Sequence, residues 1–180
     1  MSDIKAVPVD GFNGSPLIPT GNPMIDGVGP AAWADRADVP DLTAHGEAKI
    51  IPMRVAPSFT IAAGDPDPRG LPVKACDGNV AGEIVDLWVD KAEPQVRYYE
   101  IRLAGSDKHK LLPVPYVQWP HFGLWGNDHV IVKAITAAQF ADVPETKRDD
   151  RITLLEEDKI MAYYAGGHLY ATPDRAEPFI

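Results

Sequence analysis

Two alternating stretches in the middle of the chain, Glu83-Ile-Val-Asp-Leu-Trp-Val-Asp90 and Arg97-Tyr-Tyr-Glu-Ile-Arg-Leu103, decide the fold class. Side chains of an extended strand point alternately to its two faces, so both stretches are predicted to be strands. The first places Ile84, Asp86, Trp88 and Asp90 on one face and Val85, Leu87 and Val89 on the other. The second sets Tyr98, Glu100 and Arg102 against Tyr99, Ile101 and Leu103.

Shorter strand signals surround this pair. They fall at residues 49–54, 58–61, 71–75, 110–114 and 129–133, with turn residues between them. Short strands at such spacing predict a small antiparallel barrel or sandwich. Two helices are expected after it. Thr136 is the expected cap of residues 137–140, and Thr153 that of a helix that runs through Tyr164 and stops at Gly166-Gly167.

The first 48 residues differ from the rest, because six prolines are interleaved with glycines there. Such a segment cannot build its own core. Its large apolar residues favour an extended arm laid along a partner surface over disorder. We therefore expect an arm at residues 1–48, a β domain at 49–145, and a C-terminal helix and tail at 146–180 that packs on the barrel or on partner subunits.

The charge of the chain excludes one class of partner. The net charge is −9 and the sequence pI is about 4.9. A nucleic-acid-binding face needs clustered Lys and Arg, and none is visible.

Anionic lipid would repel the chain, so membrane association is expected through a protein. No apolar run reaches the length of a membrane span and no signal peptide is visible, so the chain taken alone is expected to be soluble and cytoplasmic.

Motifs for catalysis are lacking. Gly27-Val-Gly29-Pro30 lacks the Lys-Ser/Thr pair of a phosphate-binding loop, and there is no Gly-x-Ser-x-Gly elbow. The lone Cys76 beside an Asp-Gly turn excludes an intrachain disulfide and is weak evidence for a nucleophile. We therefore expect a protein that is not an enzyme.

Acidic residues and histidines leave alternatives open. Four acids lie close together in the sequence: Asp86, Asp90, Glu93 and Glu100. They are either a cluster whose pKa values are raised by proximity and burial, so that it can hold a proton, or a solvated acidic rim. His45 and Glu47 are either a weak cation site or a solvated surface pair. The remaining histidines, His109, His121, His129 and His168, are expected to be structural or exposed.

A series of phrases carries a resemblance to a known family. In order they are Thr20-Gly-Asn-Pro-Met-Ile-Asp-Gly-Val-Gly-Pro-Ala-Ala-Trp33, Asp38-Val-Pro-Asp-Leu42, Lys49-Ile-Ile-Pro-Met53, Gly70-Leu-Pro-Val73, Asp86-Leu-Trp-Val-Asp90, Leu111-Leu-Pro113, Phe140-Ala-Asp-Val-Pro144, Ile152-Thr-Leu-Leu-Glu-Glu-Asp-Lys-Ile160, Tyr163-Tyr-Ala-Gly-Gly167 and Leu169-Tyr-Ala171. This ordered set, over residues 17–175, resembles the cytoplasmic part of the heavy (H) subunit of purple-bacterial photosynthetic reaction centres.

The resemblance implies a fold and a role. The fold is mainly β with short helices: a PRC-barrel-like antiparallel β-barrel, preceded by a Pro/Gly-rich arm and followed by a C-terminal helix. The role is that of a non-catalytic subunit that caps the quinone side of the L and M subunits and helps deliver protons to the secondary quinone. It implies a place on the cytoplasmic face of the photosynthetic inner membrane, peripheral through protein partners, with light-harvesting subunits nearby.

The resemblance also assigns residues. Asp90 and Glu93 match acids on the family's proton path, and Arg97 matches a nearby basic residue; Asp86 is a further candidate. His45 matches one of two surface histidines where protons are taken up, and Glu47 stands where the second can be, which puts a metal site in doubt. No cofactor is expected on this chain itself. Bacteriochlorophyll, bacteriopheophytin, quinones and non-haem iron are expected in the partner subunits.

One departure concerns the N-terminal membrane helix of the family, which this sequence lacks. Either the chain is truncated, or a separate single-span polypeptide supplies the helix. PRC-barrels also occur in a ribosome-maturation factor, so a stand-alone protein of that type is the alternative function. The acidic balance of the chain counts against it.

Overall fold

The computed structural model describes residues 4–120 and 128–176 of the 180-residue chain. Its centre is a mixed sheet with the order β7-β6-β5-β4-β9-β8, in which β3 also pairs with β5. The strands are β3 (Ile50–Pro52), β4 (Pro72–Lys74), β5 (Val80–Asp90), β6 (Gln95–Leu103), β7 (His109–Pro113), β8 (Val117–Gln118) and β9 (Val130–Val132). The two long strands of this sheet are the two stretches that the sequence pattern predicts.

The mainly β class is confirmed, with two corrections. β4 and β9 run parallel, so the sheet is not wholly antiparallel. The strand order of the described residues ends at β7 and β8, so the sheet does not close into a complete barrel. The segment 58–61, expected to be a strand, has no strand structure, and two residues separate it from the end of the short 3-10 helix η2 (Met53–Val55).

Irregular pairing changes which side chains of β5 share a face. Ile84 pairs with Ile101 and Asp86 pairs with Glu100, so Val85 is an extra residue on β5. Directly paired residues lie on the same face, whereas neighbours along a strand face opposite ways. Ile84 and Asp86 therefore lie on opposite faces, and the expectation that they share one is wrong. The bulge at Val85, invisible in the alternation of the sequence, is the reason.

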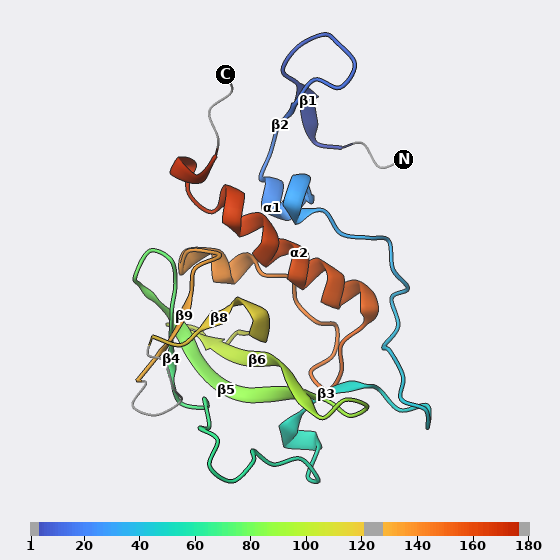
Figure 1. The fold of residues 1–180 in the computed structure, drawn as a ribbon, viewed down its shortest axis with the longest axis vertical. Helices are drawn as coiled ribbons and strands as arrows, with labels where there is room; N and C mark the ends of the chain where they lie inside the picture. Colours follow the sequence, from blue (N-terminus) through green and yellow to red (C-terminus); the bar gives the residue numbers. More distant parts are fainter. Residues whose placement is uncertain (1–3, 121–127, 177–180) are drawn as a thin grey trace.

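The long helix α2 (Leu154–Tyr170) lies across one face of the sheet (Figure 1). Its start follows the prediction, because Thr153 and Glu156 form a reciprocal capping box. Tyr164 is buried and its hydroxyl donates a hydrogen bond of 3.2 Å to the carbonyl oxygen of Leu111 in β7. The helix is thereby fixed to both the core and the edge of the sheet.

The prediction that this helix ends at Gly166-Gly167 is wrong. These two glycines lie inside the helix, where they allow other segments to pack closely against its backbone. A Cβ atom on Gly166 would lie 2.5 Å from the Cβ of Ala31, and one on Gly167 would lie 2.4 Å from the carbonyl oxygen of Ala134. Both distances are too short for any larger residue. The glycines let the N-terminal segment and the segment after β9 approach the helix backbone, and α2 continues to Tyr170.

The N-terminal segment contains more structure than an extended arm. β1 (Ala6–Pro8) and β2 (Leu17–Pro19) form a separate two-stranded hairpin. After it come α1 (Pro23–Asp26) and the 3-10 helix η1 (Gly29–Ala31), which pack on α2 of the same chain. The boundaries expected at residues 48 and 145 stay predictions.

Three further short helices lie in the described part of the chain. They are η3 (Val114–Tyr116), η4 (Ala138–Asp142) and η5 (Pro173–Arg175). η4 replaces the helix expected at 137–140, and Thr136 does not cap it; instead the Thr136 amide donates to Gln139 Oε1 at 2.9 Å.

His121 lies outside the described residues. No helix within residues 4–120 and 128–176 is long and apolar enough to cross a lipid bilayer.

Candidate functional site

A cleft of about 530 Å³ opens between the start of α2 and the adjoining ends of β5 and β6. Four separate segments supply its charged lining. The charged and phenolic residues are Arg36, Asp41, Lys49, Asp90, Arg97, Tyr98, Glu157 and Asp158. A concave site lined by several ionisable groups is a candidate functional site.

Asp90 is the most deeply buried acid of this cleft, with a side chain only 2% exposed. Its Oδ1 accepts hydrogen bonds from the backbone amides of Ala92 (2.9 Å) and Glu93 (3.0 Å). Its Oδ2 lies 3.7 Å from the ammonium nitrogen of Lys49. A buried carboxylate needs such partners, since an unpaired one is costly. The negative charge of Asp90 is also the largest of the effects that raise the pKa of Lys49.

On the α2 side of the cleft, Glu157 meets Tyr98. The Tyr98 hydroxyl donates a hydrogen bond of 3.0 Å to Glu157 Oε2. Burial raises the pKa of the Glu157 carboxyl above its usual value, although the bond from Tyr98 and the charge of Arg97 act against this. Burial and the neighbouring Glu157 also raise the pKa of Tyr98. Glu157 is therefore the group of this cleft that is disposed to carry a proton closer to neutral pH.

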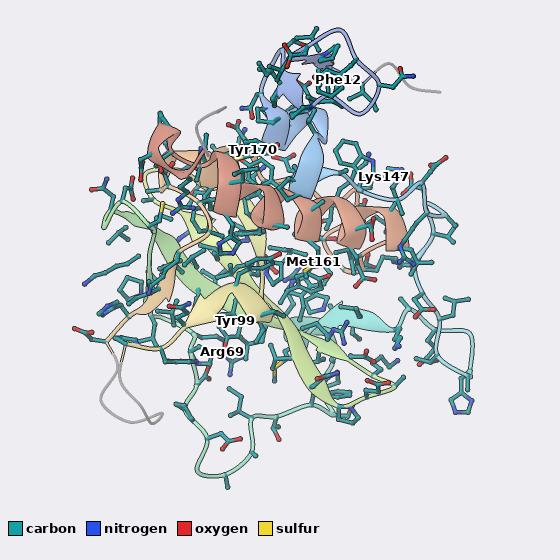
Figure 2. All side chains as sticks on the ribbon, turned by 45° about the horizontal axis from the view of Figure 1, so that its top comes forward. Phe12, Arg69, Tyr99, Lys147, Met161 and Tyr170 are labelled. Atoms are coloured by element: carbon teal, nitrogen blue, oxygen red, sulfur yellow. The ribbon has the colours of Figure 1, made fainter. Side chains whose placement is uncertain are left out.

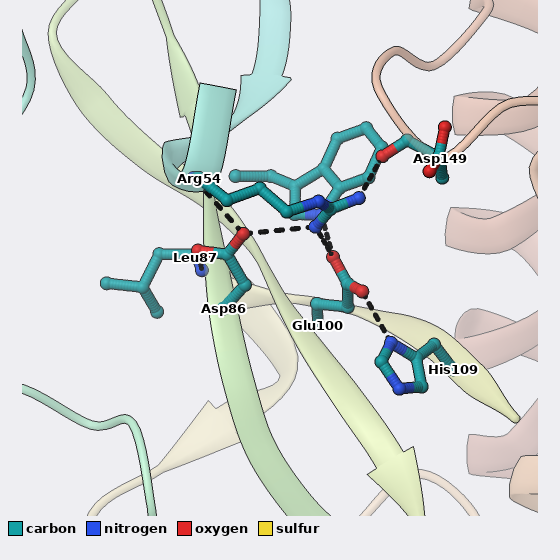
Figure 3. A network of polar contacts seen from close by, with 7 residues as sticks. Arg54, Asp86, Leu87, Glu100, His109 and Asp149 are labelled. Carbon is teal, nitrogen blue, oxygen red and sulfur yellow. Dashed lines mark hydrogen bonds and ion pairs between the residues drawn. The ribbon is translucent and has the colours of Figure 1, made fainter. Parts of the chain in front are cut away.

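A second polar network lies on the sheet at the middle of β5 and β6 (Figure 3). The guanidinium of Arg54 bridges two acids, since Nη1 donates to Asp86 Oδ2 at 3.0 Å and to Glu100 Oε2 at 2.6 Å. Its Nη2 donates to the carbonyl oxygen of Asp149. The network therefore joins the sheet to the loop that precedes α2.

Glu100 is the centre of this network, with a side chain only 8% exposed. The indole nitrogen of Trp88 donates to its Oε2 at 2.8 Å, and His109 Nδ1 lies 2.6 Å from its Oε1. Burial alone raises the pKa of Glu100, but the hydrogen bonds from His109, Trp88 and Arg54 together hold it below its ordinary value. This carboxylate is consequently kept charged and structural.

Two comparisons with protein families bear on these sites. Residues 1–55 match the model for the photosynthetic reaction centre, H-chain N-terminal region. Residues 62–139 match the model for the PRC-barrel domain. The chain is H-subunit-like and contains a PRC-barrel domain. The two matches follow one another along the chain and support a reaction-centre H-subunit role, and the H chain is a structural subunit of that complex.

Of the residues expected on a proton path, the structure of this H-subunit-like protein brings Asp90 and Arg97 to one cleft. Glu93 is exposed in the turn after β5, where its amide binds Asp90 and its carboxylate accepts from Gln95 at 3.3 Å. Asp86 lies apart from them, in the Arg54 network. The single acid cluster expected from the sequence is therefore two clusters, each with its own cation.

His45 and Glu47 occupy an exposed loop closed by the bridge between Leu42 and Ala48. The Glu47 carboxylate pairs with Lys91, the residue after Asp90, and this contact lowers the pKa of Glu47. In the described part of the chain, no group of three or more His, Cys, Asp or Glu is arranged to hold a metal ion. The loop is thus tied to the end of β5 through an ion pair.

Sequence reasoning missed four residues that define the sites: Lys49 and Glu157 in the cleft, and Arg54 and His109 around Glu100. Lys49 approaches Asp90 because β3 pairs with the end of β5, placing Ile50 opposite Asp90. Glu157 lies in the first turn of α2, where an acid is explained by the helix dipole alone. Only the tertiary fold distinguishes these residues from ordinary surface charges.

Proposed function

We propose that the chain is the H-type subunit of a photosynthetic reaction centre, bound to the cytoplasmic side of its L and M subunits. It covers the quinone side of these partners, excludes water from it and stabilises the complex. The ordered matches to the H-chain N-terminal region and to the PRC-barrel domain carry this proposal. The expected pigments, quinones and non-haem iron belong to the partner subunits, and light-harvesting subunits lie nearby.

We further propose that the cleft at Asp90 delivers protons to the secondary quinone, which takes up two protons when it is reduced. Asp90 supports this role because it is nearly fully buried yet keeps a cation, Lys49, within 3.7 Å. Glu157 supports it because burial raises the pKa of its carboxyl, so it exchanges a proton more readily near neutral pH. Arg97 lines the same cleft, and its charge acts against burial by lowering the pKa of Glu157.

The surface loop with His45 and Glu47 is the proposed place of proton uptake. Its Glu47 pairs with Lys91, which directly follows Asp90 in the chain. Both loop residues are exposed, so bulk water reaches them. In this account protons pass from the loop to Asp90 and Glu93 and on to Glu157, without any redox step in this chain.

The alternative, a stand-alone PRC-barrel protein of the ribosome-maturation type, is less well supported. It explains the match over residues 62–139 but not the match of residues 1–55 to an H-chain region. It also calls for a basic face toward RNA, whereas the chain carries a net charge of −9.

The experiment that tests proton delivery uses complexes that contain the full chain. A double variant, Asp90→Asn with Glu93→Gln, is compared with the wild type by flash-induced electron transfer to the secondary quinone between about pH 6 and pH 9. We expect the proton-coupled second electron transfer to slow, and the first to keep its rate. A second electron transfer that is unchanged across this range would remove the proton-delivery proposal while leaving the structural role standing.

A further inference from the structure

Most of the large apolar side chains that are exposed in the described part of the chain lie in the hairpin of β1 and β2 or next to it. Of the twelve large apolar side chains that are exposed, seven lie between residues 4 and 25: Ile4, Val7, Val9, Phe12, Leu17, Ile18 and Ile25. Phe12 is 61% exposed and lies at the far end of the hairpin, away from the sheet and α2 (Figure 2). Clustered exposed apolar residues, unlike single ones, indicate an interaction surface.

Both faces of this hairpin are apolar. Val7 pairs with Ile18, which puts these two side chains on one face, and Pro8 pairs with Leu17 on the other. Val7, Ile18 and Leu17 are 48%, 36% and 49% exposed. A hairpin that rests on a flat surface needs only one apolar face. Apolar side chains on both faces fit a hairpin that is enclosed in a groove.

Within the described residues, the hairpin pairs with no strand of the main sheet. It forms a sheet of its own, and α1 and η1 separate it from the body of the protein (Figure 1). An isolated two-stranded hairpin is at best marginally stable in water. A surface that covers its apolar side chains would stabilise it.

The charges and prolines of the hairpin favour a protein groove over other partners. Lys5 and Asp10 are the charged residues between positions 4 and 19, and Lys5 is already paired with Asp26 at 2.6 Å. The described residues of this hairpin therefore offer no free cation to anionic lipid headgroups. Pro8, Pro16 and Pro19 lack amide donors, which disfavours edge-to-edge pairing with a second copy.

We propose that the β1–β2 hairpin is a docking finger that inserts into an uncharged, apolar groove of a neighbouring subunit in the assembly. The inference rests on the proposed function, and the partner is a membrane-embedded subunit of the reaction centre. The whole hairpin lies within the match to the H-chain N-terminal region, residues 1–55. Contacts of its side chains on both faces, rather than backbone pairing, hold it in the groove.

The test compares full-length tagged chains recovered from native membranes. Val7→Ser with Ile18→Ser removes one apolar face, Leu17→Ser weakens the other, and Phe12→Ser changes the tip. Val80→Ser is the matched control, since Val80 is 47% exposed but lies on β5 of the main sheet. The readout is the bacteriochlorophyll absorption that each chain retains after a detergent wash. We expect about tenfold less retention for the two-residue hairpin variant and wild-type retention for the control.

Each outcome decides the inference. Equal retention by all variants would overturn the docking finger and leave the proposed function intact. Loss of pigment from every chain, the wild type included, would overturn the proposed function and the inference with it. The purified wild type and the Val7→Ser, Ile18→Ser variant are also compared by light scattering and by sedimentation with phosphatidylcholine and phosphatidylglycerol vesicles. A dimer or vesicle binding that depends on Val7 and Ile18 would contradict a protein groove.

Discussion

The phenol oxygen of Tyr98 and a carboxylate oxygen of Glu157 lie 3.0 Å apart although 59 residues separate them in the chain. The contact joins β6 to the first turn of α2 and forms one wall of the cleft that contains Asp90. It stabilises the charged form of a glutamate whose pKa is raised by burial. Burial and this hydrogen bond therefore move the pKa of Glu157 in opposite directions, and burial is the larger effect.

Replacing Tyr98 by Phe removes the hydrogen bond that favours the charged form of Glu157, so the pKa of Glu157 should rise further. The carboxyl stretching band in a pH titration followed by infrared spectroscopy measures this, with Glu157→Gln identifying the band. Tyr163→Phe is the control, because Tyr163 donates to the backbone oxygen of Gln139 instead. A titration of Glu157 that stays the same in Tyr98→Phe would contradict the assigned role of the bond.

Replacing Glu157 by Gln should change how stability depends on pH. The pKa of Glu157 is higher in the folded chain than its ordinary value of 4.5. Its contribution is therefore fully present below that value and is lost as the pH rises through the folded-state pKa. Relative to the wild type, Glu157→Gln should gain stability toward about pH 8. Chemical denaturation at several pH values measures this gain.

Glu47 provides a control of opposite sign for that experiment, because the ion pair with Lys91 lowers its pKa. Glu47→Gln should gain no stability at the higher pH. An equal gain in both variants would show that net charge, and not the environment of Glu157, is the cause.

Replacing Glu100 by Gln should destabilise the fold by about 2 kcal/mol at neutral pH, because Arg54 loses a buried partner. The pKa of Glu100 lies below its ordinary value of 4.5 in the folded chain, so its stabilisation is present above that value and is lost at lower pH. The difference from the wild type should shrink on acidification. Glu83→Gln, whose 3.4 Å pair with Arg102 is exposed, should change stability by less than about 0.5 kcal/mol.

Replacing Gly167 by Ala should destabilise the protein by about 1–3 kcal/mol, although Ala is the better helix former. The added Cβ would lie 2.4 Å from the carbonyl oxygen of Ala134, a backbone atom that has to shift. Thermal unfolding measures the effect. His168→Ala, at the adjacent exposed position, should stay within about 0.5 kcal/mol of the wild type. A stabilised Gly167→Ala would mean that the helix does not pack so closely.

The sequence predicted the parts of the fold that local patterns encode. The alternation of residues 83–90 and 97–103 identified β5 and β6, and Thr153 correctly marked the start of α2. The prediction that α2 ends at Gly166 and Gly167 was wrong. A glycine pair that ends a helix and one that lets two segments approach look the same in a sequence. The bulge at Val85 was hidden for a similar reason, since it depends on pairing with β6.

The candidate site was predictable only in part. The resemblance pointed to Asp90 and Arg97, which the structure places in one cleft. Lys49 and Glu157 reach the same cleft from β3 and α2, and no spacing in the sequence relates them to Asp90. Asp86, expected beside Asp90, instead pairs with Arg54. Contacts between distant segments decide which charges act together.

Recovery of the chain from its native membranes shows whether it is an H-type subunit of a reaction centre. The tagged full-length chain is recovered from its native membranes, and the absorption spectrum and the peptides of the eluate are determined. If it is such a subunit, we expect near-infrared bacteriochlorophyll bands together with L and M subunits, and a small single-span polypeptide if the family's membrane helix is supplied separately. A colourless eluate, with ribosomal proteins or with no partner, would contradict it.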